Sequence, residues 1–132
     1  MDKKEFVRQA VEAKQQLFNQ ISDQIWQFAE AGMKEYKSAE YLEKAAADQG
    51  FSVETGVAGI PTAFIASYGS GKPVIAFLGE FDALPGLSQK AACPVHDELV
   101  PGAYGHGCGH NCLGAAALAA ASAVKEYMIQ NN

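Results

Sequence analysis

The sequence predicts an α/β domain, a layered sheet with helices on both faces. Apolar residues recur at helical spacing in the first part of the chain, runs rich in β-branched and aromatic residues follow, and an alanine-rich segment comes last. Helices, then strands, then a loop and a further helix are an order typical of layered α/β domains. With 132 residues, 48% of them hydrophobic, the chain has the size and composition of one folded unit.

The first part of the chain is predicted to be helical. Residues 2–31 read as one long helix or as two with a slight break, and Gly32 is the expected stop. Ser38 is expected to cap a further helix that ends at Gly50. The apolar residues that define the first stripe, and that we expect to pack in the core, are Val7, Val11, Phe18, Ile21, Ile25 and Phe28.

Strands are predicted in the middle of the chain, over residues 52–57, 62–68 and 73–81. The sequence GSGK between the second and the third is a turn signal. The run Val74–Leu78 is apolar throughout, which is typical of a strand buried on both faces of a covered sheet.

A long segment without periodicity follows, from Pro85 to about Gly114, and it holds all 3 histidines of the chain. Loops of such length in compact domains are usually functional or disordered. The alanine-rich segment from Leu113 to Ile129 is predicted as a helix that packs on the sheet. Its charge-free part, Cys112–Val124, is too short to span a bilayer.

Charge and cysteine content restrict the partners and the compartment. The chain carries 10 basic and 15 acidic residues, a formal net charge of −5, which argues against nucleic acid or an anionic membrane as a partner. The first residues are charged and helical in pattern rather than those of a signal peptide. With 3 cysteines, an odd number, a disulfide framework is not expected, so we predict a reducing cytoplasm as the location.

The motif GHGCGHN, residues 105–111, carries imidazole and thiol groups between glycines. In an extended segment His106, Cys108 and His110 would project from one face. Imidazole nitrogen and thiolate sulfur are ligands for zinc and other divalent transition metals, so the motif favours metal binding. Two alternatives stay open, a nucleophilic Cys108 with a histidine base and incidental loop residues. A phosphate-binding loop is disfavoured, because the GxGxxG spacing and the Walker lysine are missing.

The motif GEFDALPGLS, residues 79–88, follows the predicted buried strand at its carboxyl end, where open α/β sheets bind ligands. Glu80 and Asp82 would share one face if the strand persisted to that point. A carboxylate there can bind a metal or orient a ligating imidazole, although solvated residues at a strand end are the alternative. Together the two motifs predict half of a metal site.

These motifs, in this order and about twenty residues apart, resemble the aminoacylase/carboxypeptidase-type metallopeptidases. The similarity is greatest to the amidohydrolase branch that cleaves N-acyl and N-aroyl amino acids, and it extends over essentially the whole chain. The stretches DQIWQFAEAGMKEYKSAEYL and IPTAFIASYGSGKPVIAFLGEFDALPGLSQ also carry it.

The resemblance implies a role for individual residues. Cys108 and His110 match the first metal ligands of the branch, and Asp82 matches its catalytic-support aspartate. Glu80 stands where many relatives have a ligating histidine, and His106 matches a supporting histidine beside the cysteine. The wider branch often reads CGHDxH, whereas here Asn111 and Leu113 replace the last aspartate and histidine; we expect Asn111 to play a supporting part.

The resemblance also implies a metal-dependent hydrolase of N-acyl amino acids that uses two divalent ions, manganese or zinc, which share a water. The family's fold is a di-metal aminopeptidase-like catalytic domain, and its members run to several hundred residues. Residues 1–132 would be the N-terminal portion of that domain, without the lid or dimerisation domain, the later ligands and the glutamate that acts as general base. We therefore expect an inactive chain that forms homo-oligomers or joins a complementing chain. The alternative is a non-catalytic module that binds a metal or a partner.

Overall fold

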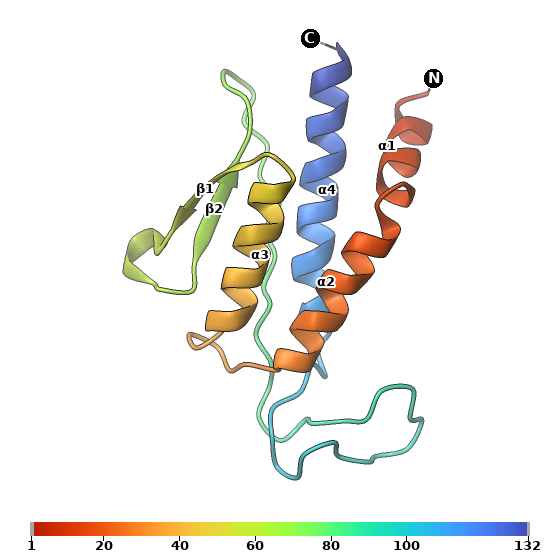
Figure 1. Cartoon of the computed structure of the whole chain (residues 1–132), viewed down its shortest axis with the longest axis vertical. Helices are drawn as coiled ribbons and strands as arrows, with labels where there is room; N and C mark the ends of the chain where they lie inside the picture. Colours follow the sequence, from red (N-terminus) through yellow and green to blue (C-terminus); the bar gives the residue numbers. More distant parts are fainter. Residues whose placement is uncertain (1, 132) are drawn as a thin grey trace.

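A computed structural model describes residues 2–131, which form helices and one small antiparallel sheet (Figure 1). A short 3-10 turn, η1 at Val57–Gly59, connects the two strands. The helices are α1 (Lys3–Glu12), α2 (Gln15–Phe28), α3 (Tyr36–Asp48) and α4 (His110–Asn131), and the strands are β1 (Ser52–Thr55) and β2 (Phe64–Ser67).

The first predicted helical region is two helices, α1 and α2, with a break at Ala13 and Lys14. The apolar stripe is confirmed in α2, where Phe18, Ile21 and Ile25 are buried. It is not continuous into α1, because Val7 is 40% exposed. α2 ends before the predicted stop at Gly32, since Ala29 takes a left-handed backbone conformation with φ 44°.

α3 begins before Ser38, so the prediction of Ser38 as its cap is wrong. The carboxylate of Glu30 accepts hydrogen bonds from the backbone N–H groups of Lys37 (3.0 Å) and Ser38 (2.8 Å). It also accepts one from the Ser38 hydroxyl, at 2.8 Å. A carboxylate at this end satisfies free N–H groups and interacts favourably with the helix dipole. The predicted end at Gly50 agrees with the turn that follows α3, in which Gly50 has φ +80°.

The sheet consists of β1 and β2, paired antiparallel in a register that sets Val53 opposite Ala66. Val53, Phe64 and Ala66 turn toward the hydrophobic core, whereas Ile65 on the other face is 48% exposed. Within residues 2–131 no helix covers that other face, so helices on both faces are not found in the described chain. The mixture of helices and a small sheet is compatible with part of an α/β domain.

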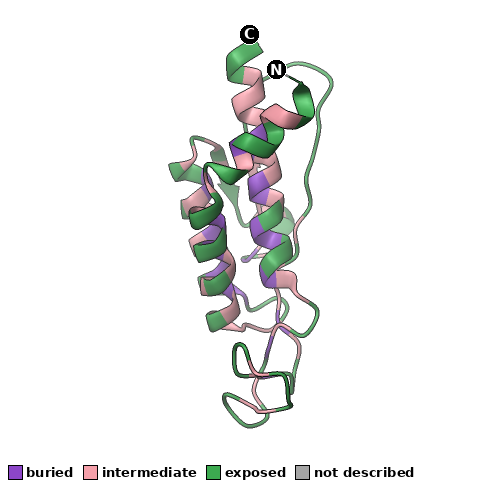
Figure 2. Ribbon diagram, turned by 90° about the vertical axis from the view of Figure 1, so that its right-hand side faces the viewer, coloured by how far each residue is buried: buried purple, intermediate pink, exposed green. Residues whose placement is uncertain are grey.

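The third predicted strand is absent among the described residues. Residues 73–81 run as an extended thread that passes between α3 and α4 in Figure 1 and has no strand assignment. The prediction that Val74–Leu78 is buried is wrong, because all of these residues are exposed (Figure 2). A strand requires a hydrogen-bonded neighbour, and no other segment of residues 2–131 lies alongside to provide one.

α4 is the central helix and contacts α1, α2 and α3. Its buried residues Ala115, Leu118 and Ala119 join Ile21 and Ile25 of α2 in the core. In Figure 2 the thread of residues 73–81 lies on the opposite side of α4 from α2. By length and composition α4 could cross a membrane, with a mean hydropathy of 1.3 over an 18-residue window. In this fold 28% of that window is buried. The core helix of a soluble protein can pass the same test of length and composition.

Candidate metal centre

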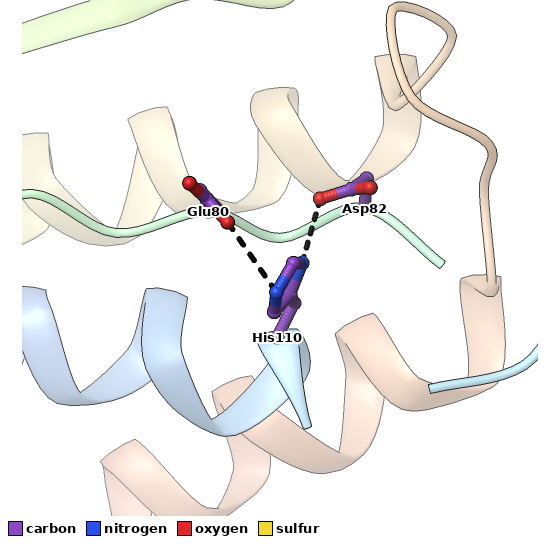
Figure 3. Close-up of side chains that lie close together, drawn as sticks. All are labelled: Glu80, Asp82 and His110. Carbon is purple, nitrogen blue, oxygen red and sulfur yellow. Dashed lines mark hydrogen bonds and ion pairs between the residues drawn. The ribbon is translucent and has the colours of Figure 1, made fainter. Parts of the chain in front are cut away.

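Glu80, Asp82 and His110 form a cluster at the start of α4 (Figure 3). The Nδ1 atom of His110 lies 2.7 Å from Oδ1 of Asp82, and its Nε2 atom lies 3.3 Å from Oε2 of Glu80. The imidazole is thus held between two carboxylates. Its side chain is 17% exposed and that of Asp82 is 28% exposed, whereas Glu80, at 71%, is open to solvent.

A close approach between glycines brings the two carboxylates to α4. A Cβ atom on Gly79 would lie 2.8 Å from the Cβ of Ala117 and 3.1 Å from the Cα of Gly114. One on Gly114 would lie 3.2 Å from the Cβ of Phe81. Because neither position has a side chain, the extended backbone packs directly on the helix, and the residues that follow Gly79 reach the helix N-terminus.

The backbone after Asp82 is fixed by a second contact. The N–H of Ala83 donates to the carbonyl of Glu30 at 2.7 Å, in an isolated bridge between Ala31 and Ala83. Asp82 is therefore held between α4 and the turn that follows α2.

His110 is the first residue of α4, and Gly109 precedes it with φ +79°. This left-handed conformation favours glycine and lets the chain turn sharply into the helix. The carbonyl of Gly109 accepts hydrogen bonds from the N–H groups of Cys112 and Leu113. Asn111 is buried and donates to the Ser22 hydroxyl at 3.0 Å, which ties the start of α4 to α2.

The donor atoms of the cluster fit a divalent cation. The three side chains offer one nitrogen and two oxygen atoms that all lie within 4.8 Å of one another. Two ligands about 2.1 Å from a tetrahedral ion are separated by roughly 3.4 Å, and His110 Nε2 and Glu80 Oε2 are 3.3 Å apart. Asp82, on the opposite ring nitrogen, has the place of the carboxylate that commonly orients a metal-binding histidine.

The prediction that residues 105–111 are extended, with three donors on one face, is wrong. The motif is a turn in which the N–H of Gly109 bonds to the carbonyl of His106, and it leads into α4. Its donors point to different surroundings: His110 joins the cluster, Cys108 is exposed, and His106 contacts α2. Gly109, with φ +79°, turns the chain at this point, so the three side chains do not alternate along an extended backbone.

His106 packs against the last turns of α2. Its Nε2 atom lies 3.1 Å from the carbonyl of Ile25, and its Nδ1 atom is buried without a hydrogen-bond partner. Burial lowers the pKa of His106, and the hydrogen bond to Ile25 only partly offsets this effect. The folded chain therefore favours the neutral imidazole, whose Nε2–H donates to Ile25.

Acidification should destabilise the chain through His106. Because its pKa is lowered in the folded state, the unfolded chain takes up the proton first as the pH falls through about 6.5. The stabilising contribution is complete above that pH and is lost below it. We expect the free energy of unfolding, measured in urea, to fall between pH 7.5 and pH 5.5, and His106→Gln to reduce this fall. His96→Gln is the control, since the His96 side chain is 80% exposed. An equal pH dependence in His106→Gln and in the unmodified chain would contradict this role.

Two acidic residues that hold the backbone around α3 were not singled out by the sequence. Glu30 caps α3 with its carboxylate and holds Ala83 with its carbonyl. Glu35 is only 8% exposed, and its Oε2 accepts a hydrogen bond from the Thr62 hydroxyl at 2.9 Å. Both lie in the stretch of residues 23–42 that carries part of the family resemblance, but neither was identified there as a site residue. Their partners are distant in the chain or depend on the path of the backbone.

The comparison with known proteins identifies a relative that is similar along nearly the whole chain. Over 125 residues, 95% of its own length, the chain is 54% identical to a subunit of the p-aminobenzoyl-glutamate hydrolase of Escherichia coli (strain K12). The resemblance is confirmed. The motifs at residues 79–88 and 105–111, which carried the resemblance, lie in a chain that is similar to this hydrolase subunit along nearly its whole length. The chain spans 26% of the length of this relative, which is consistent with an N-terminal portion. No known protein-family profile matches the chain.

Proposed function

We propose that this chain contributes part of the active site of a metal-dependent hydrolase that cleaves the amide bond of p-aminobenzoyl-glutamate or a related N-acyl amino acid. The relative's name supports a hydrolase function of this type in general. The observation that carries the proposal is the imidazole of His110 held between Asp82 and Glu80. Such a donor set, a histidine with carboxylates, is common at catalytic metal sites.

Each residue of the cluster has a distinct task in this proposal. Asp82 accepts the Nδ1–H of His110, which fixes the ring and leaves Nε2 free to bind the ion. Glu80 supplies a carboxylate oxygen beside Nε2. A bound divalent cation would supply Lewis acidity for the amide carbonyl and lower the pKa of water. Asn111 and His106 act at a distance, by fixing the start of α4 and the turn before it to α2.

The family resemblance adds Cys108 to the proposed ligands. Its thiol is exposed and lies outside the cluster of Glu80, Asp82 and His110. It is only two residues from His110, on a turn with glycines on both sides, so binding of an ion is proposed to draw it in. A thiolate favours zinc, and carboxylates suit manganese. We propose one of these metals, with two ions in the complete site.

The general base and the remaining ligands are proposed to come from polypeptide outside these 132 residues, so that residues 1–132 form the N-terminal portion of a di-metal catalytic domain. We further propose a cytoplasmic location, no binding to nucleic acid or membrane, and assembly either with copies of the chain or with a complementing chain.

We therefore expect the isolated chain to bind Zn²⁺ or Mn²⁺ weakly and to hydrolyse p-aminobenzoyl-glutamate little or not at all. Titration calorimetry measures the first property, and release of p-aminobenzoate measures the second. Rapid hydrolysis by the isolated chain that Cys108→Ser abolishes would contradict the assignment of the base to another polypeptide. An absence of metal binding would favour the alternative of a non-catalytic module that binds a partner.

A nucleophilic Cys108 is the remaining alternative, and its exposure makes it testable. Alkylation of Cys108, in a chain whose other cysteines are serine, should be slowed by metal if the thiol is a ligand. Rapid labelling that metal does not change would indicate a thiol of low pKa instead.

A further inference from the structure

Glu35 is a buried carboxylate without a cationic partner in the described part of the chain. The residue is only 8% exposed. Its single side-chain hydrogen bond comes from the hydroxyl of Thr62, which is itself 4% exposed. No ion pair of Glu35 forms within residues 2–131. A buried carboxylate costs free energy unless it is paired and hydrogen-bonded, and such departures from the usual rules are expected mainly at functional sites.

The carboxylate of Glu35 lies near that of Asp82, and Gly32 stands between the two. A Cβ atom on Gly32 would lie 3.7 Å from Oδ2 of Asp82 and 3.9 Å from Oε1 of Glu35. Because residue 32 has no side chain, nothing from that position shields one carboxylate from the other. The bridge between Ala31 and Ala83 holds this turn beside Asp82.

The two oxygen atoms of Asp82 have different surroundings. Oδ1 lies 2.7 Å from Nδ1 of His110 (Figure 3). Oδ2 lies on the side of Gly32 and Glu35 and accepts no hydrogen bond within residues 2–131. Like charges repel more strongly in a partly buried site than in water, because the effective dielectric constant is lower. This repulsion opposes a rotation of the Asp82 carboxylate toward Gly32 and favours its orientation toward His110.

Thr62 holds the Glu35 carboxylate in this position. Its hydroxyl donates to Oε2 of Glu35 at 2.9 Å, and the other oxygen, Oε1, is the one near Gly32. Thr62 is two residues before β2, so the small sheet fixes the donor. Since both partners are buried, water competes little for this hydrogen bond.

We propose that Glu35 is a positioning residue: its carboxylate keeps Asp82 turned toward His110 and thereby fixes the imidazole ring for the metal ion. The inference rests on the proposed function, in which His110 is a ligand. Glu35 acts through Asp82 and is not itself part of the cluster. A residue that only tied the start of α3 to the sheet would need its hydrogen bond with Thr62, but not its charge.

The test replaces Glu35 by glutamine, which has the same shape and can still accept the Thr62 hydroxyl but carries no charge. NMR of the metal-free chain, labelled with ¹⁵N at histidine, measures how fast the Nδ1–H of His110 exchanges with water; single histidine substitutions assign the signals. We expect this exchange to be about threefold faster in Glu35→Gln, because Asp82 leaves the ring more often. The affinity for Zn²⁺, measured by titration calorimetry, should fall about threefold, less than loss of a direct partner of a metal ligand produces.

Glu40→Gln is the matched control. Glu40 lies on α3 and is exposed, and its substitution removes the same charge from the chain. This variant should exchange and bind Zn²⁺ like the unmodified chain. Circular dichroism checks that α1–α4 are retained. Thr62→Val is the second variant: it has a similar shape but cannot hold the Glu35 carboxylate, so it should also speed the exchange.

Exchange in Glu35→Gln equal to that in the unmodified chain would overturn the inference, since the hydrogen bond with Thr62 would then account for Glu35. An equal effect of Glu40→Gln would overturn it too, because loss of any negative charge would suffice. Binding of Zn²⁺ in either case leaves the proposed function intact. Faster exchange in Glu35→Gln, in a chain that binds neither Zn²⁺ nor Mn²⁺, supports the role of Glu35 in orienting Asp82 and refutes the proposed function.

Discussion

Replacement of His110 by alanine should lower the affinity of the chain for Zn²⁺ or Mn²⁺ at least about 100-fold, the upper end of what loss of a single supporting contact to a metal ligand produces. His110 is the only residue of the cluster that offers a nitrogen ligand, and a carboxylate oxygen lies close to each of its two ring nitrogens. Without the ring, Glu80 and Asp82 remain as two like charges with no group between them. Titration calorimetry of the isolated chain measures the affinity.

Two further variants make the His110 result specific. Asp82→Asn retains a hydrogen-bond acceptor for Nδ1–H but removes the charge, so we expect a smaller loss of about 10-fold. His96→Ala should leave the affinity unchanged, because His96 is largely exposed and outside the cluster. If His96→Ala weakens binding as much as His110→Ala does, the measured binding is at the surface and not at this site. Circular dichroism distinguishes loss of the ligand from loss of the first turn of α4.

Replacement of Gly105 by alanine should lower the free energy of unfolding by about 3 kcal/mol, at the upper end of the usual range for overpacking. A Cβ atom at this position would lie 1.9 Å from the carbonyl oxygen of Leu87. Gly105 also forms a pair of backbone hydrogen bonds with Leu84, both 3.0 Å long. Since the obstructing atom is backbone, the two ends of the loop between Leu84 and Gly105 must separate.

Gly107→Ala is the matched control in the same loop. A Cβ atom there would approach the Leu87 Cδ1 atom at 2.6 Å, which is the end of a flexible side chain that can rotate away. We expect a loss below about 1 kcal/mol, the size of an ordinary surface change. Urea unfolding monitored by circular dichroism compares the two, and amide exchange at Gly105 reports the loop itself. Equal losses for both variants would show that the contact with the Leu87 carbonyl does not limit the loop.

Helices could be predicted from the sequence because their signal is local. The apolar period through Phe18, Ile21 and Ile25 is confirmed in α2, and the alanine-rich segment is confirmed in α4. The boundaries were less accurate. α3 is capped by Glu30, which lies outside the helix, and α2 ends where Ala29 takes a left-handed conformation. Both depend on how the chain turns, and a single residue type does not specify this.

The strands could be predicted only where the partner lies close in sequence. β1 and β2 are confirmed because a short connection lets them pair with each other. Residues 73–81 have an equally strong strand pattern and form none, since a strand depends on a neighbour as much as on its own residues.

For the candidate site, the residue types that carry the chemistry were determined by the sequence alone: two carboxylates after an apolar run, and histidines with a cysteine in a glycine-rich motif. Which of them meet was decided only by the tertiary structure. Gly79 and Gly114 let the extended backbone contact α4, and Gly109 turns the chain so that His110 begins the helix. His110 therefore reaches Glu80 and Asp82, while Cys108 faces solvent and His106 contacts Ile25. Spacing of two residues gives one face only if the backbone is extended, and it is the packing of distant segments that sets the backbone here.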